Sequence, residues 1–137
     1  MIEARHIEAL TNLLGEKGLL TAPGDRAAYE TGARYDNGRA AFVARPASTA
    51  ETSAVVAYCV QNGIALVPQS GKTALVSGST PADSGPQDVP SLDRRPAPFY
   101  LDRVNRSVQP VARLVLAELT VNIEESGLFF AIVLLPC

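Results

Sequence analysis

Apolar residues recur at intervals of three and four in several stretches of this chain, and this spacing predicts amphipathic helices. One such stretch is Ile7–Leu14, which ends at two glycines, and another lies between Ser48 and Gly63. A third extends from Leu116 to Gly127. A shorter helical turn is expected at Asp25–Glu30, where the residues are more polar. The pattern therefore places helices near both ends of the chain and in its middle.

The central helix has sequence signals at both of its ends. Ser48-x-x-Glu51 is a capping box, in which the serine oxygen and the glutamate each accept a bond from a backbone N–H at the helix start. Asn62-Gly63 favours a left-handed C-cap. The apolar face of the helix consists of Thr52, Val55, Val56, Cys59 and Val60. Cys59 is expected to act as a small buried hydrophobe.

Short apolar runs on either side of this helix predict strands. Ala41–Arg45 stops at Pro46, and Ile64–Pro68 follows the helix directly, so the order is strand, helix, strand. The two strands of such a βαβ unit should be parallel, with a right-handed crossover. Further short strands are expected at Val89–Leu92, Phe99–Leu101 and Arg106–Gln109. The predicted fold class is α+β: a small three-stranded, largely parallel βαβ layer with helices, followed by the start of an antiparallel sheet.

Composition narrows the functional classes. The chain has 137 residues, which is single-domain size, and its formal net charge of −2 gives no electrostatic basis for binding nucleic acid or an anionic membrane. Two cysteines and one histidine are too few for a disulfide framework or a metal cluster. The N-terminal residues include charges and no long apolar run, so we expect no signal peptide and a cytoplasmic protein. No transmembrane segment is predicted either.

The apolar run Leu128–Leu135 has a different character from the rest of the chain. It is much shorter than the roughly 20 residues that span a bilayer. As a strand it would be buried on both faces, and such a strand needs structure to cover it. We therefore expect the chain to be the N-terminal piece of something longer, and we expect Leu128–Leu135 to associate with a second copy in a homo-oligomer.

The loop Gln69–Thr80 contains the strongest candidate chemistry. It follows a predicted strand, and its glycines and small hydroxyl residues leave backbone N–H groups open to a phosphate. Three interpretations compete. The first is an ordinary Ser/Gly surface loop. The second is a Walker-type loop ending in Gly71-Lys72-Thr73, although Leu66 stands where that motif needs a glycine and poor helix-forming sequence follows. The third is a loop that holds the pyrophosphate of a flavin.

The order of motifs along the chain favours the flavin interpretation. The relevant segments are AFVARPASTAETSAVVAYCVQNGIALVPQSGKTALVSGS, SLDR at 91–94, DRVNRSV at 102–108 and LAELTVNIEESGLFF at 116–130. Together they resemble the FAD-binding domain of FAD-linked oxidases in the vanillyl-alcohol-oxidase-like superfamily. The closest resemblance is to the D-lactate and D-2-hydroxyglutarate dehydrogenases and the glycolate oxidase flavin subunit. The resemblance implies FAD as cofactor, held by Pro68, Gln69, Ser70, Gly71, Lys72, Thr73, Ala74, Leu75, Gly78 and Ser79.

The resemblance also implies a domain division and a function. Residues 1–40 would be an N-terminal helical segment and loop, and residues 41–137 an incomplete FAD-binding domain without the substrate domain that carries the family's catalytic residues. The chain would be the FAD-binding module of an oxidoreductase acting on 2-hydroxy acids, and inactive by itself. Where the family has Gly-Gly-Asn-Thr-Gly, this chain has Ser70 to Ala74, with two glycines and the asparagine replaced. The alternative is therefore a truncated or decayed, non-catalytic protein that folds or oligomerises without a cofactor.

Overall fold

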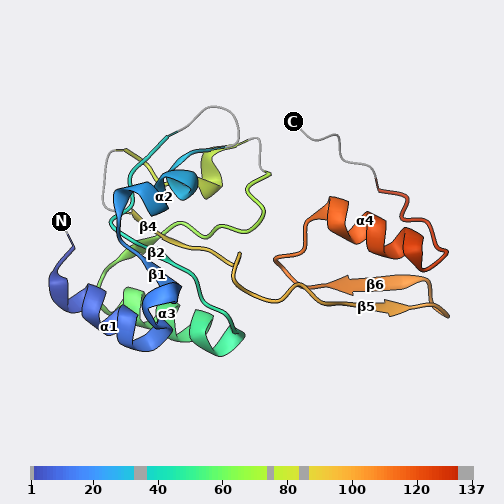
Figure 1. The fold of residues 1–137 in the computed structure, drawn as a ribbon, viewed down its shortest axis with the longest axis horizontal. Helices are drawn as coiled ribbons and strands as arrows, with labels where there is room; N and C mark the ends of the chain where they lie inside the picture. Colours follow the sequence, from blue (N-terminus) through green and yellow to red (C-terminus); the bar gives the residue numbers. More distant parts are fainter. Residues whose placement is uncertain (1, 33–36, 74–75, 84–86, 133–137) are drawn as a thin grey trace. The chain divides into compact units, whose positions relative to one another are not determined.

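The computed structural model describes residues 2–32, 37–73, 76–83 and 87–132. These residues form two compact units, Met1–Arg95 and Pro96–Cys137, which are coloured along the chain in Figure 1. Across the described ranges the chain forms α-helices, short strands and two 3-10 turns. The predicted α+β class is confirmed, with a mainly parallel sheet in the first unit and an antiparallel hairpin in the second.

The sheet of the first unit has the strand order β1-β2-β4-β3 among the described residues. Its strands are β1 (Leu19–Leu20), β2 (Val43–Ala44), β3 (Ala65–Leu66) and β4 (Gln87–Pro90). β1 is antiparallel to β2, whereas β4 is parallel to both β2 and β3. The two strands of the predicted βαβ unit thus have the expected direction. However, β4, which corresponds to the strand expected at Val89–Leu92, lies between them, and β1, which was not predicted, makes the layer four-stranded rather than three-stranded.

Helices cover both faces of this sheet. α1 (Ala4–Leu14) and α3 (Thr49–Gln61) lie together on one side, and α2 (Pro23–Glu30) lies on the other (Figure 1). Side chains alternate along a strand, so Phe42 and Ala44 pack against α1 and α3, whereas Val43 packs with Tyr29 of α2. The interior of the unit therefore has two hydrophobic clusters, one on each face of β2.

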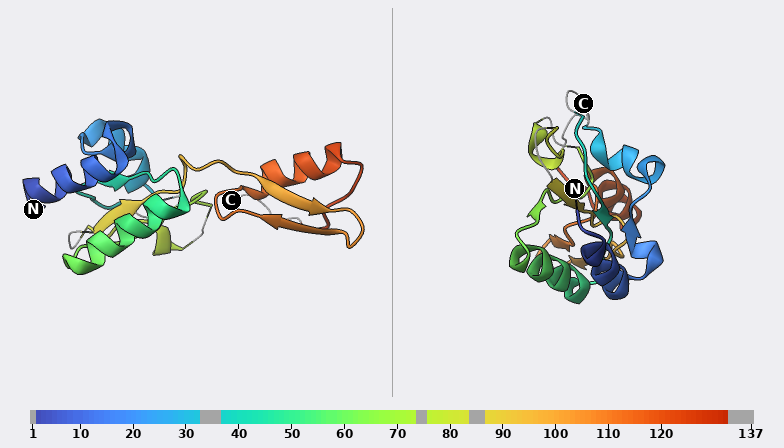
Figure 2. Two further views of the ribbon diagram at one scale, coloured as in Figure 1. Left: turned by 90° about the horizontal axis from the view of Figure 1, so that it is seen from below. Right: turned by 90° about the vertical axis from the view of Figure 1, so that its left-hand side faces the viewer.

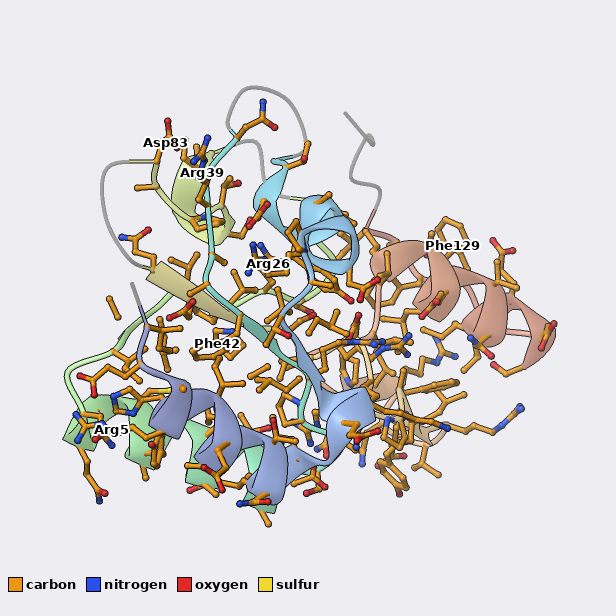
Figure 3. All side chains as sticks on the ribbon, turned by 60° about the vertical axis from the view of Figure 1, so that its left-hand side comes forward. Arg5, Arg26, Arg39, Phe42, Asp83 and Phe129 are labelled. Atoms are coloured by element: carbon orange, nitrogen blue, oxygen red, sulfur yellow. The ribbon has the colours of Figure 1, made fainter. Side chains whose placement is uncertain are left out.

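A partly buried arginine and a buried aspartate hold the chain that leads into β2. Arg26 of α2, labelled in Figure 3 with Phe42, donates from Nη1 to the Ala41 carbonyl oxygen at 2.6 Å. Asp88 of β4 accepts bonds from the backbone N–H groups of Ala41 and Phe42, at 2.7 and 2.9 Å. Burial raises the pKa of Asp88, although these two bonds act in the opposite direction. The start of β2 is thus fixed from both neighbours, α2 and β4.

The predicted signals at the ends of α3 are largely confirmed. Ser48 Oγ accepts a bond from the Glu51 N–H at 3.1 Å, and Gly63 has the left-handed φ of +65°. The Glu51 carboxylate accepts from the Ala47 N–H at 2.8 Å, one residue before the cap itself. The predicted apolar face is only half covered, because Val55 and Cys59 are buried but Val56 and Val60 are exposed. Burial raises the pKa of the Cys59 thiol to about 11.

The second unit consists of a hairpin and one helix. β5 (Phe99–Asp102) and β6 (Ser107–Pro110) pair in antiparallel fashion, close to their predicted positions. Asp102 closes the turn by accepting bonds from the N–H groups of Val104 and Asn105. α4 (Leu116–Glu125) follows, and Figure 2 shows it lying along the hairpin. Of the apolar positions that predicted this helix, Leu119 and Ile123 are buried and Leu116 is partly exposed.

Candidate functional site

The carboxyl ends of the parallel strands meet at one edge of the sheet, and the candidate loop begins there. Arg45 follows β2, Gln69 follows β3, and Ser91 follows β4. Gln69 and Ser91 form a parallel bridge, in which the Gln69 N–H donates to the Pro90 carbonyl at 2.9 Å. Ligands of parallel α/β sheets bind at this edge. The loop therefore starts from a fixed point at the part of the sheet where a ligand is expected.

Gln69 is the most deeply buried of the predicted cofactor residues, with 2% of its surface exposed. Its Nε2 donates to the carbonyl oxygens of Tyr29 and Ser79, at 2.6 and 2.7 Å. Since both partners are acceptors, the orientation of the amide is settled. Its Oε1 is buried and has no hydrogen-bond partner among the described residues. An unsatisfied buried acceptor costs about 1–3 kcal/mol of folding free energy.

Lys72 has an uncommon backbone conformation, with a φ of +52°. This left-handed region is unfavourable for lysine but is several-fold enriched in asparagine, the residue that the resembled family has here. The Lys72 ammonium donates to the Ala28 carbonyl oxygen and lies 5.7 Å from the centre of the Tyr29 ring. It also borders an open cavity of about 370 Å³, whose other lining residues are Ala28, Thr31 and Gly32. The loop's one ammonium group is thus bound to the end of α2.

The remaining predicted residues differ in where they lie. Pro68, Ser70, Gly71, Thr73 and Gly78 are exposed, and Ser79 is partly exposed. Ala74 and Leu75 lie outside the described residues. A Cβ placed on Gly78 would meet no atom within 4 Å, so the space next to that glycine is open. Exposed backbone, small side chains and one nearby ammonium group suit the diphosphate of FAD.

The Walker interpretation is not supported. A Walker loop leads into an α-helix that begins at its lysine. Among the described residues between Lys72 and β4, the chain forms only the 3-10 turn Ser77–Ser79. Groups of three or more His, Cys, Asp and Glu side chains that could hold a metal ion are also absent from the described ranges.

A polar network that the sequence analysis missed lies beside the loop. The Tyr29 hydroxyl donates to Asp93 Oδ2 at 2.5 Å, and Arg45 Nε donates to both carboxylate oxygens of Asp93, at 2.9 and 3.1 Å. Burial and the neighbouring Asp93 raise the pKa of Tyr29 to about 12. Burial alone would raise the pKa of Asp93, but the bonds from Arg45 and Tyr29 outweigh it and lower that pKa. The bond to Asp93 likewise raises the pKa of Arg45.

Sequence position could have indicated two of the three residues in this network. Arg45 and Asp93 each follow a short strand, where parallel strands present functional side chains. Tyr29 has no comparable signal, because it belongs to a polar helix some 60 residues from its partner Asp93. Three segments distant in sequence therefore meet at the carboxyl edge of the sheet.

Comparison with known proteins identifies relatives but no matching family model. The chain is 36% identical over 75 residues to the quinone-dependent D-lactate dehydrogenase of Haemophilus influenzae, covering 55% of this chain and 13% of the relative. It is 37% identical over 82 residues to the probable mitochondrial D-2-hydroxyglutarate dehydrogenase of Oryza sativa subsp. indica, covering 60% and 14%. The chain thus spans only about one seventh of the length of these relatives.

Solved structures share the fold. Two crystal forms of alkyldihydroxyacetonephosphate synthase match with TM-scores of 0.76 and 0.75, at 14% identity, over 93% of this chain and 26% of that one. None of the described helices is long and apolar enough to cross a membrane. Together with the sequence relatives, these matches confirm the resemblance noted above. The chain is therefore similar in sequence to D-lactate and D-2-hydroxyglutarate dehydrogenases and shares its fold with part of alkyldihydroxyacetonephosphate synthase, as the resemblance to FAD-linked oxidases implies.

Proposed function

We propose that this chain is the FAD-binding module of an FAD-linked oxidoreductase that acts on 2-hydroxy acids. The observation that supports it best is the loop that begins at Gln69, at the carboxyl edge of the sheet, in a chain similar to D-lactate and D-2-hydroxyglutarate dehydrogenases. The flavin would supply the hydride chemistry. The chain would bind the diphosphate through backbone N–H groups of Gly71, Thr73 and Gly78 and through the Lys72 ammonium.

We expect this binding to be weak and the chain to be inactive alone. The described residues provide a loop for the diphosphate, but the carboxylate beside it, Asp93, is engaged in bonds with Tyr29 and Arg45. Lys72 also adopts a backbone conformation that favours asparagine. Even with added FAD, the chain should therefore oxidise neither D-lactate, glycolate nor D-2-hydroxyglutarate. The predicted cytoplasmic location stays a prediction, since the rice relative is named as mitochondrial.

Titration with FAD, ADP and riboflavin tests the proposed binding. FAD and ADP both contain the diphosphate and riboflavin does not, so we expect the first two to bind and riboflavin to bind far more weakly. Lys72→Gln should weaken FAD binding about tenfold, because a hydrogen bond to a charged group is lost. Lys17→Gln is the matched control, since Lys17 is exposed in the turn Glu16–Gly18.

The same titration distinguishes the alternative. If the wild-type chain binds neither FAD nor ADP at millimolar concentrations, the alternative is supported, in which the chain is a non-catalytic protein that folds without a cofactor. Stoichiometric FAD that survives dialysis would show that binding is tight and that our expectation of weak affinity is wrong.

A further inference from the structure

Helix α2 ends in backbone carbonyls that cannot be bonded within the helix, at residues 27–30. The outer two have partners close by in the sequence. Thr31 Oγ1 donates to the Ala27 oxygen at 3.0 Å, and the Gly38 N–H donates to the Glu30 oxygen at 2.9 Å. The outer caps are therefore local and do not involve the candidate loop.

The inner two carbonyls are capped by the candidate loop. Gln69 Nε2 donates to the Tyr29 oxygen at 2.6 Å, and Lys72 Nζ donates to the Ala28 oxygen. The same Nε2 also donates to the Ser79 oxygen at 2.7 Å, so one amide group joins the start of the loop, its end and α2. The negative end of the helix dipole favours the Lys72 ammonium at this place.

α2 is itself attached to the sheet on two sides. The Tyr29 hydroxyl is bonded to Asp93 after β4, and Asp93 is bonded to Arg45 after β2. Arg26 joins α2 to the Ala41 carbonyl before β2. A loop that is fastened to the end of α2 is therefore fastened to the carboxyl edge of the sheet.

We propose that the C-terminal end of α2 is the platform that sets the conformation of the cofactor loop, with Gln69 as the positioning residue. This inference rests on the proposed function in so far as the loop is taken to bind a diphosphate. An apolar side chain of similar size would avoid burying Oε1 without a partner among the described residues, but it would leave the Tyr29 and Ser79 carbonyls without the donor that Nε2 provides. The two hydrogen bonds from Nε2 explain why glutamine suits position 69.

Cleavage by endoproteinase Lys-C tests the platform without any ligand. The chain has two lysines, Lys72 in the loop and Lys17 in the turn before β1, so the protease reports on the loop and provides an internal reference. Gln69→Leu removes both bonds and should raise the rate of cleavage after Lys72 about tenfold, while cleavage after Lys17 is unchanged. Thr11→Val is the matched control, because it removes the same kind of bond, from a threonine hydroxyl to the carbonyl four residues earlier, in a different helix, α1.

A second variant covers the case in which Gln69→Leu folds poorly. Tyr29→Phe leaves the Tyr29 carbonyl in place but removes the bond to Asp93, and it should raise cleavage after Lys72 about two- to threefold. Unchanged cleavage after Lys72 in both variants would overturn the proposal. A parallel rise at both lysines would also overturn it, because Gln69 would then only support global stability.

FAD affinity provides the readout that links the platform to function. Gln69→Leu should weaken FAD and ADP binding by about the same factor as it raises cleavage, whereas Thr11→Val should leave both affinities unchanged. If the wild-type chain binds neither nucleotide, the proposed function fails, while the cleavage ratio still decides whether α2 fixes the loop. If FAD binds equally to wild type and to Gln69→Leu, the positioning role is wrong and the proposed function stands.

Discussion

The two units of the molecule contain the same kinds of element but differ in how much side chain they bury. In the first unit both faces of β2 are covered, and Phe42, Val43 and Ala44 are all fully buried. In the second unit, Leu119 and Ile123 of α4 are the buried hydrophobic residues within the described range. Tyr100, Val104, Val121, Phe129 and Ile132 are exposed there. A two-stranded hairpin is marginally stable in water, so we expect the first unit to supply most of the stability.

Truncation of one phenylalanine in each unit gives the largest expected difference. Phe42→Ala removes a side chain with no exposed surface and should lower the free energy of unfolding by about 3–5 kcal/mol. Phe129→Ala removes one that is 76% exposed and should change it by less than about 0.5 kcal/mol. Urea denaturation measures both. Equal losses would show that Phe129 is covered in solution and that the contrast between the units is wrong.

Asp93→Asn tests the polar network of the first unit. It should lower the free energy of unfolding near neutral pH by about 1.5–3 kcal/mol, because hydrogen bonds to a charged group are weakened. Asp83→Asn is the matched control, since Asp83 is an exposed carboxylate 3.7 Å from Arg39 (both labelled in Figure 3) and should have little effect.

The pH dependence of this variant follows from the direction of the pKa shifts. The pKa of Asp93 is lowered by folding, so its contribution to stability is complete above the unfolded value of about 3.9 and is lost as the pH falls through the lower, folded value. The wild-type chain should therefore lose more stability than Asp93→Asn on acidification below about pH 4. The pKa of Tyr29 is raised to about 12, so its contribution is lost as the pH rises from about 10 to 12. Thermal unfolding of the wild type and of Asp93→Asn across pH 2–6, at equal ionic strength, tests the expectation for Asp93. Parallel curves of stability against pH would contradict it.

A pair of glycine substitutions probes packing at a smaller scale. A Cβ on Gly38 would lie 1.6 Å from the Pro81 carbonyl oxygen, so Gly38→Ala should cost about 1–3 kcal/mol of stability. A Cβ on Gly24 of α2 would meet nothing within 4 Å, and Gly24→Ala should stabilise by about 0.5–1 kcal/mol. In thermal unfolding we expect Gly38→Ala to be less stable and Gly24→Ala more stable than the wild type. A loss of stability in both variants would mean that α2 is not helical at Gly24.

Removal of the C-terminal apolar run should have the smallest effect on stability but a clear effect on association. Phe129 and Ile132 are 76% and 55% exposed, and the rest of Leu128–Leu135 from residue 133 on lies outside the described residues. We propose that this run pairs with a second copy of the chain. A chain ending at Gly127 should therefore sediment closer to monomer and unfold within about 0.5 kcal/mol of the full chain. A full-length chain that is monomeric at tens of micromolar would disprove this pairing.

The helices and most strands of the fold could be predicted from local signals, whereas the two-residue strand β1 could not. The bounds of α3 follow from Ser48, Glu51 and Gly63, because caps act within one turn of the helix. The insertion of β4 between β2 and β3 could not be predicted, since strand order depends on contacts between residues far apart in sequence. The same limit explains Val56 and Val60: spacing identifies the apolar face of α3 but not how much of it a neighbour covers.

The candidate site was predictable in place but not in detail. A glycine- and serine-rich loop after a βαβ strand indicates where a ligand would bind. It does not indicate that Gln69 points inward, that Lys72 takes a left-handed φ, or that both bind carbonyls of α2. These details depend on α2, whose sequence is polar and whose link to Asp93 joins residues 64 positions apart.

The central place of β4 also constrains the order in which the first unit can fold. β2 and β3 flank α3 in sequence, yet every parallel ladder in the described sheet includes β4. A nascent chain that has emerged only as far as Leu66 therefore contains β2 and β3 but lacks the strand that pairs with both, and only the antiparallel pairing of β2 with β1 is available. Its helices can form from local contacts, but parallel pairing must wait until Pro90 has been synthesised. Until then β3 and the β4-facing edge of β2 are unpaired, and during this period of synthesis the chain is exposed to mispairing.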